Sequence, residues 1–155
     1  MSSKDHSDKR HIYVSSDFLQ QFVDAAASIP FIVNLNSARA VNGFRFDAGT
    51  DTVTVRKSGL YQCQFSIQLA NVAFPPPQNP NPVLTFAIAR NGGIVIPSQT
   101  SFNANTADTI YVTSNLLLQY LDKGDRIQIW LTGPNPLPSG SLLRIDYASL
   151  TLIEL

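Results

Sequence analysis

Turn-forming residues divide most of this chain into short apolar segments, and that division limits the folds it can adopt. Between the turns, apolar and polar residues alternate, which is the pattern of a β-strand with one buried face. A series of such strands predicts a sandwich or barrel of antiparallel strands. This kind of scaffold carries no chemistry of its own, so any function must come from its loops, its faces or its assembly. The dividing turns lie at Gly43, Gly49, Gly59, the prolines of 75–82, Asn91-Gly92-Gly93, 122–125 and 133–140.

The clearest strand spans 59–69. From position 61 its odd-numbered residues form an apolar set, and the even-numbered residues between them are polar and uncharged. The two sets are Tyr61, Cys63, Phe65, Ile67 and Leu69, and Gln62, Gln64, Ser66 and Gln68. Further strands are predicted at 31–35, 38–41, 44–46, 52–55, 83–90, 93–97, 108–121, 126–132 and 142–155, with hairpins joining the third to the fourth and the fifth to the sixth. We therefore expect about eight to ten strands in one domain.

Charged residues are scarce in this chain. They make up 14% of its 155 residues, while hydrophobic residues make up 44%. An average soluble protein is about 25% charged. The simplest explanation is that a partner covers part of the surface, and the simplest partner is another copy of the chain. The formal net charge is zero, which gives no electrostatic reason to expect nucleic acid or an anionic membrane as a partner.

Residues 1–30 are predicted to be a tail and a short docking segment. Residues 1–11 are polar and are expected to be disordered, and no secretory signal is evident. Within 16–27, Ser16 suits the N-cap of a short helix that ends before Pro30, and a strand followed by a turn is the alternative. We expect residues 12–30 to pack on the assembly or to contact other surface-layer proteins, while 31–155 forms the globular domain. No stretch approaches the ~20 apolar residues of a membrane-spanning helix.

The sequence contains no recognisable catalytic group. The two histidines, His6 and His11, both lie in the expected tail, so neither can complete a serine or cysteine triad on the domain. Cys63 is the single cysteine and is expected to be a buried, unreactive thiol. Glu154 has no evident carboxylate partner and is expected to be a solvent-facing charge. We therefore predict a protein that is not an enzyme and has no catalytic residue, cofactor site or metal site.

Two binding alternatives are weaker. Asp122 and Asp125, with nearby carbonyls or with Asp108 and Asp146, have the oxygen ligands that calcium prefers. Residues 122–125 are more typical of a tight turn, in which aspartate binds its own backbone. Aromatic rings suit a sugar site, although in a sandwich they usually fill the core or an interface. The rings in question are those of Tyr61, Tyr120, Trp130 and Tyr147.

Three short motifs follow one another as they do in a known family. They are Ser58-Gly59-Leu60-Tyr61 followed by Phe65, Arg90-Asn91-Gly92, and Leu121 followed by Gly124-Asp125, Ile127 and Ile129. Together they resemble the globular head domains of complement's first component, whose superfamily includes tumour necrosis factor. The order and approximate spacing agree over 31–155. The last strand, 148–155, looks more like that of bacterial members, which commonly sit at the ends of collagen-like filaments on spore surfaces, although this chain has no Gly-X-Y repeat.

The resemblance implies an all-β, ten-stranded jelly-roll sandwich over 31–155 that assembles as a homotrimer. We expect the trimer interface on the uncharged face of the strand at 59–69 and on its neighbours, with Leu116 beside them. A polar face exposed to solvent is the alternative. The predicted interface residues are Gln62, Gln64, Ser66, Gln68, Leu118, Tyr120, Tyr147, Ser149, Thr151 and Ile153.

The resemblance favours a non-enzymatic trimeric structural protein at the surface of a cell, a bacterial spore or a similar particle. In a spore, it would belong to the exosporium or the coat. Without a signal peptide, it would be assembled there from the cytoplasm or the mother cell. The alternative is a soluble trimeric module that recognises a protein or glycan through the loops at 75–82 and 133–141.

Overall fold

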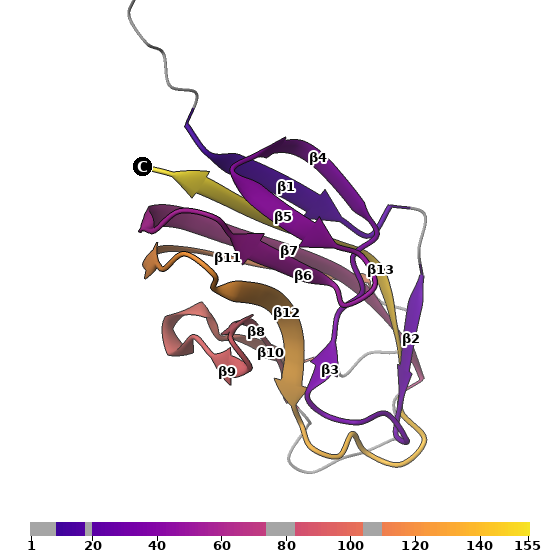
Figure 1. Ribbon diagram of the computed structural model, residues 1–155. Helices are drawn as coiled ribbons and strands as arrows, with labels where there is room; N and C mark the ends of the chain where they lie inside the picture. The colour runs from indigo at the N-terminus through magenta and orange to yellow at the C-terminus, as the bar shows by residue number, and fades with distance from the viewer. Residues whose placement is uncertain (1–8, 18–19, 74–82, 104–109) are drawn as a thin grey trace, which may run out of the picture.

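The computed structural model describes residues 9–17, 20–73, 83–103 and 110–155. They form two antiparallel β-sheets that pack face to face in a jelly-roll sandwich (Figure 1). The described ranges contain no α-helix, only one turn of 3-10 helix, η1 (Ile96–Ser98). No helix in these ranges is long and apolar enough to cross a membrane. The all-β class predicted from the sequence is therefore confirmed.

Sheet A has the strand order β11-β7-β13-β1-β4, and β2 pairs with one end of β13. The bounds are β11 (Ile110–Leu121), β7 (Gly59–Ala73), β13 (Leu142–Glu154), β1 (His11–Ser15), β4 (Ser37–Asn42) and β2 (Gln21–Asp24). β11 is the edge strand at one end of this order. The long strand β7 is its neighbour, and the long strand β13 follows β7.

Sheet B has the order β10-β8-β12-β6-β5, with β3 pairing with β12 and β9 with β8. The bounds are β10 (Thr100–Asn103), β8 (Val83–Arg90), β12 (Arg126–Gly133), β6 (Thr52–Val55), β5 (Phe44–Asp47), β3 (Phe31–Ile32) and β9 (Gly93–Ile94). Within the described ranges, the two main orders together hold ten strands, the number that the resemblance implies, but two of them, β1 and β10, were not predicted. The strands predicted at 31–35 and 93–97 are shortened to β3 and β9, which lie outside the main orders. The short strands β2, β3 and β9 are additions beside them.

The chain changes sheet between successive long strands. β7, β11 and β13 belong to sheet A, whereas β8 and β12 belong to sheet B. Neighbours within a sheet are therefore distant in sequence, as where Ser66 of β7 lies opposite Ser149 of β13. This crossing places residues from several parts of the chain on each outer face.

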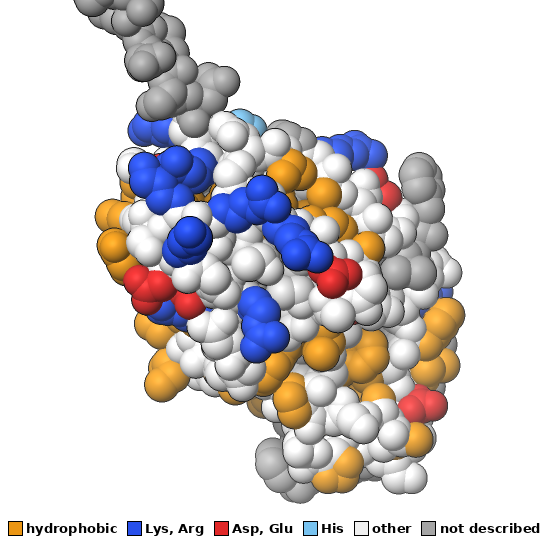
Figure 2. Space-filling model, viewed as in Figure 1, with side chains coloured by type: hydrophobic (Ala, Val, Ile, Leu, Met, Phe, Trp, Pro, Cys, Tyr) orange, Lys and Arg blue, Asp and Glu red, His pale blue; other side chains and the backbone are white. Residues whose placement is uncertain are grey.

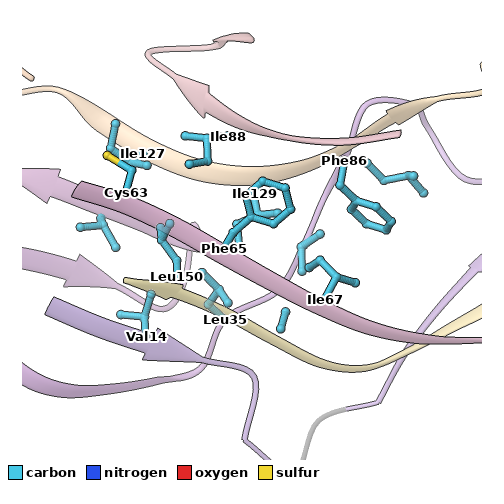
Figure 3. Packing of buried hydrophobic residues seen from close by; sticks show 14 of the residues in the cluster. Val14, Leu35, Cys63, Phe65, Ile67, Phe86, Ile88, Ile127, Ile129 and Leu150 are labelled. Carbon is cyan, nitrogen blue, oxygen red and sulfur yellow. The ribbon is translucent and has the colours of Figure 1, made fainter. Parts of the chain in front are cut away.

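The apolar set of β7 points into the space between the sheets, as predicted. Tyr61, Phe65, Ile67 and Leu69 are fully buried, and Cys63 is almost so. Figure 3 shows Phe65 beside Ile129 and Cys63 beside Ile127, with both isoleucines contributed by β12. Each such side chain stabilises the fold by roughly 1.5–3 kcal/mol when buried. Burial also raises the pKa of the Cys63 thiol to about 12, consistent with the unreactive thiol predicted from the sequence.

The hairpin predicted at Asn91-Gly92 is confirmed. Both residues have positive φ, 53° and 81°, as a two-residue turn between twisted strands requires. Arg90 pairs with Gly93 across the turn. The second strand is shorter than predicted, because η1 begins at Ile96 and leads into β10, a strand that the sequence analysis did not predict.

The N-terminal segment is part of the sandwich. β1 pairs with β13 on one side and with β4 on the other, and β2 pairs with β13. The short helix predicted within 16–27 is therefore wrong, and the strand-and-turn alternative describes the segment better. Ile12, Val14 and Val23 are buried in the core, so tertiary pairing outweighs local helical spacing here. Residues 1–8, which hold most of the expected tail, lie outside the described residues, as do the proline loop at 75–82 and Asp108.

Candidate self-association face

All ten predicted interface residues lie on the outer face of sheet A. Leu118 of β11 lies opposite Gln62 of β7, which in turn lies opposite Ile153 of β13. The other cross-strand pairs are Tyr120 with Leu60, Gln64 with Thr151, Ser66 with Ser149, and Gln68 with Tyr147. We call the outward residues of β11, of β7 and of 147–153 the A face. Its position between subunits remains a prediction.

Large apolar side chains are exposed along β11. Val112 is 72% exposed, Leu116 55%, Leu118 58% and Tyr120 55%, and the neighbouring Leu60 is 45% exposed. Leu116, Leu118 and Tyr120 follow one another along β11, and Leu60 lies opposite Tyr120 on β7. Val112 lies farther along β11, beyond Ser114. Contiguous apolar surface of this kind is typical of a binding face, because a monomer gains stability by covering it.

β11 is also the edge of sheet A. The strand is 12 residues long, and within the described residues no other strand of this sheet pairs with its outer side. Natural proteins usually cover a long edge strand or place charges on it, because its free N–H and C=O groups attract other strands. β11 contains no Asp, Glu, Lys or Arg, so the edge is suited to being covered.

The centre of the A face is polar but uncharged. It holds Gln62, Gln64, Ser66, Ser149 and Thr151, all of which are at least partly accessible. Amides and hydroxyls can exchange hydrogen bonds with water for hydrogen bonds with a partner, whereas a buried ion would need a matching charge. Charges occur farther along β13, where Arg144 Nε lies 2.5 Å from Asp146 Oδ1. These two charges compensate each other within the subunit.

Two tyrosines join β1 to the A face. The hydroxyls of Tyr13 and Tyr147 are hydrogen-bonded to each other. Burial, followed by the bond to Tyr147, raises the pKa of Tyr13 to about 12. The Tyr13 hydroxyl therefore stays neutral at physiological pH and adds no charge to the face.

The structure corrects the prediction for Glu154. Its side chain is only 20% exposed, and its Oε2 lies 2.9 Å from Nη1 of Arg10. Burial alone would raise the pKa of Glu154, but hydrogen bonds from the Arg10 backbone and side chain outweigh this effect and lower it. The pair was not predictable from the sequence, in which Arg10 belongs to a polar tail, because only the pairing of β1 with β13 brings Arg10 beside the last strand.

The segment at 122–125 forms the predicted turn. Asp125 Oδ2 accepts a hydrogen bond from the Asp122 backbone N–H at 2.8 Å. Nη2 of Arg90 lies 3.1 Å from Asp122 Oδ2 and 2.7 Å from Asp125 Oδ2. An arginine thus neutralises the carboxylates proposed as calcium ligands. Within the described residues, no group of three His, Cys, Asp or Glu side chains could hold a metal ion.

Comparison with solved structures relates this architecture to known domains. The chain superimposes on the tumour necrosis factor Eiger from S. frugiperda with a TM-score of 0.61 and 10% identity, over 95% of this chain and 92% of that one. It superimposes on the globular domain of zebrafish complement 1qA protein with a TM-score of 0.61 and 19% identity, over 95% and 98% of the two chains. The fold is that of these domains. The resemblance noted in the sequence is confirmed at this level, and no finding singles out the spore-surface branch.

No family model matches the sequence. No curated protein matches it either.

Some residues on or beside the A face were not predicted from the sequence, among them Leu60, Val112 and Tyr13. Leu60 and Val112 lie at the two ends of the β7–β11 pairing, and Tyr13 contacts the face from β1. Leu60 and Val112 could have been found by extending the outward alternation of their strands. Tyr13 could not, because its strand was not recognised.

Proposed function

We propose that this chain is a non-enzymatic module that associates with itself through the A face, and that the assembly is a homotrimer. The observation that carries the proposal is the uncharged edge strand β11, which exposes Leu116, Leu118 and Tyr120 beside the polar centre of sheet A. A threefold arrangement is what the resemblance to complement and tumour necrosis factor domains implies.

The energetics of the A face favour association. Each large apolar group that becomes buried contributes roughly 1.5–3 kcal/mol. Several such groups per subunit can offset the cost of bringing the subunits together, which is at least about 4 kcal/mol for each association. Because no charge lies among them, little ionic desolvation opposes assembly.

Light scattering on two matched variants tests the proposal. Wild-type protein should have about three times the chain mass of 17.0 kDa. Leu118→Asp places a charge on the A face and should give a folded monomer at micromolar concentration. Ile32→Asp is the control, because Ile32 lies in β3 of sheet B and is 39% exposed, and it should remain trimeric. A monomeric wild-type protein, or a Leu118→Asp variant with unchanged mass, would contradict the proposal.

We further propose that the trimer serves as a structural unit of a surface layer, such as the outer layer of a bacterial spore. Support comes from the last strand, which resembles that of the bacterial head domains at the ends of collagen-like filaments on spore surfaces. Contacts of residues 12–30 with other surface proteins would use outward side chains such as Phe22, which is 58% exposed. Immunogold labelling in the native host tests this role, and label confined to the cell interior would contradict it.

The alternative is a trimeric module that binds a protein or glycan ligand through its loops. The loop between β12 and β13 supports it, because that loop joins two core strands and is exposed at Asn135, Pro136, Ser139 and Gly140. Replacement of the exposed Asn135, Pro136 and Ser139 with glycine, which leaves the buried Leu137 in place, should then abolish ligand binding without changing the mass of the assembly.

A further inference from the structure

The outer face of sheet B carries a polar hollow that the self-association proposal does not use. Its volume is about 350 Å³, and it spans β5, β6 and β12. Figure 2 shows Lys and Arg side chains gathered over these strands. The lining includes Arg45 and Asp47 from β5, Thr52 and Thr54 from β6, and Arg126 and Gln128 from β12.

Two arginines flank one threonine in this hollow. Arg45 lies opposite Thr54 on one side, and Arg126 lies opposite Thr54 on the other. Neighbouring strands are about 4.8 Å apart, so the two arginines start about 10 Å from each other, and their long side chains can reach one anion between them. Planar guanidinium groups suit carboxylate and sulfate oxygens because they donate paired hydrogen bonds.

Both guanidinium groups are available for a ligand. Neither Arg45 nor Arg126 forms an ion pair with a described residue. Four other arginines are paired with carboxylates at 2.5–3.1 Å; these are Arg10, Arg39, Arg90 and Arg144. Arg56 also forms no ion pair with a described residue, but it does not line the hollow. The only acidic residue in the lining, Asp47, uses Oδ1 to accept a hydrogen bond from the Gly49 N–H at 2.9 Å.

The rest of the lining is held in place and can bind hydroxyl groups. Nε2 of Gln128 donates to the Thr50 carbonyl at 2.9 Å and to the Thr52 hydroxyl at 3.1 Å. Oε1 of Gln128 accepts from the Trp130 indole at 3.0 Å. These bonds fix the floor of the hollow, and the Thr54 hydroxyl and the Asp47 carboxylate lie around it. Preorganised polar groups bind a ligand at a smaller entropic cost.

We propose that this hollow binds an acidic sugar residue. Its anionic group, a carboxylate or a sulfate ester, lies between Arg45 and Arg126, and its hydroxyls contact Thr54 and Asp47. The volume falls within the range of about 300–1,000 Å³ seen for small-ligand sites. The lining residues are polar and include no aromatic ring on which a nucleobase could stack. Asp47 disfavours a dense polyanion, so the geometry favours a single charge surrounded by hydroxyls.

The experiment is an NMR titration of the full chain at low salt with three probes. They are digalacturonic acid, its carboxyl-reduced neutral counterpart, and galactose 6-sulfate. Hydrogen bonds to a charged group contribute about 1.5–3 kcal/mol, so at least one acidic probe should bind about tenfold or more tightly than the neutral sugar. The stronger acidic probe identifies the anionic group. Binding of the neutral sugar as tightly as both acidic probes would overturn the proposal.

Matched variants locate the site. Arg45→Gln and Arg126→Gln should each weaken the acidic probe about tenfold, whereas Lys123→Gln, which removes the same charge outside the hollow, should not. Equal weakening by all three variants, or no effect of the arginine variants, would overturn the proposed site. Inorganic sulfate that binds as tightly as the acidic sugars would overturn the sugar assignment. Melting temperatures verify that each variant is folded, and the chain mass, measured separately, keeps this test distinct from that of self-association.

Discussion

The two outer faces of the sandwich differ in charge and in exposed apolar area. The A face carries no ionised group between residues 147 and 153 or along β11, and it exposes leucine, valine and tyrosine side chains. The face of sheet B over β5, β6 and β12 instead presents two unpaired arginines among threonines. Both faces rest on the same core, so the core does not impose the difference.

The contrast indicates separate roles for the two faces. An apolar, uncharged surface gains free energy when another protein surface covers it. A surface with unpaired guanidinium groups loses hydration free energy when covered, unless an anion replaces the water. We therefore expect the A face to be buried between subunits and the sheet B face to remain accessible in the assembly.

The largest expected effect comes from placing one negative charge at the centre of each face. Ser66→Asp on the A face would bring three like charges near the threefold axis and should dissociate the assembly, since an unpaired buried charge costs about 3–5 kcal/mol. Thr54→Asp, the matched change on sheet B, should leave the mass unchanged. Analytical ultracentrifugation measures both masses. If both variants dissociate, or neither does, the two faces do not differ as proposed.

A second prediction concerns linkage between folding and assembly. If the A face is buried between subunits, the melting temperature of the wild-type protein should rise by on the order of a few °C for each tenfold increase in concentration. Differential scanning calorimetry over a hundredfold range measures this rise. The dissociated Ser66→Asp variant should show no such dependence. A wild-type melting temperature that is independent of concentration would place the A face in solvent.

A third prediction tests a junction that joins the sheets beneath these faces. Arg90 of β8 in sheet B binds Asp125 and also donates to the Tyr120 carbonyl of β11 in sheet A, at 3.2 Å. Burial by itself raises the pKa of Asp125, but hydrogen bonds from the Asp122 backbone and Asn91, together with Arg90, lower it overall. The stabilisation is therefore fully present above the unfolded-state value of about 3.9 and is lost as the pH falls through the lower folded-state pKa.

Asp125→Asn should reduce the free energy of unfolding by about 1–3 kcal/mol at pH 7 and remove this part of the acid dependence. Urea unfolding at pH 7 and at pH 3 measures both effects. Asp24→Asn, at an exposed position, is the control and should change stability by less than about 0.5 kcal/mol. If the two variants show the same stability at pH 7, the junction does not couple the sheets.

The smallest expected effect is that of salt on self-association. With no ionised group on the A face, the dissociation constant should change by less than about twofold between ~0.05 and ~0.5 M NaCl. Binding of an acidic sugar on the opposite face should weaken markedly over the same range, since it depends on exposed charges. A strong salt dependence of self-association would mean that charged residues outside the A face contribute to the interface.

Much of the strand pattern was predictable from the sequence because it depends on local rules. The alternation in β7 separated the buried Phe65 from the outward Ser66, and Asn91-Gly92 specified a hairpin whose backbone angles few other residue pairs adopt. The same alternation identified the outward residues of β7, β11 and β13. Their assignment to one side of a strand needs no knowledge of the neighbouring strand.

Which strands lie side by side was decided only by the tertiary structure. β1 was missed because its few apolar residues are compatible with more than one local structure, and pairing with β13 and β4 selects the strand. That pairing also brings Arg10 to Glu154. Likewise, Arg45 and Arg126 are separated by most of the domain in sequence and converge on Thr54 only when β5, β6 and β12 pair. Local periodicity fixes the direction of a side chain, but backbone pairing between distant segments fixes its neighbours, and both outer faces depend on those neighbours.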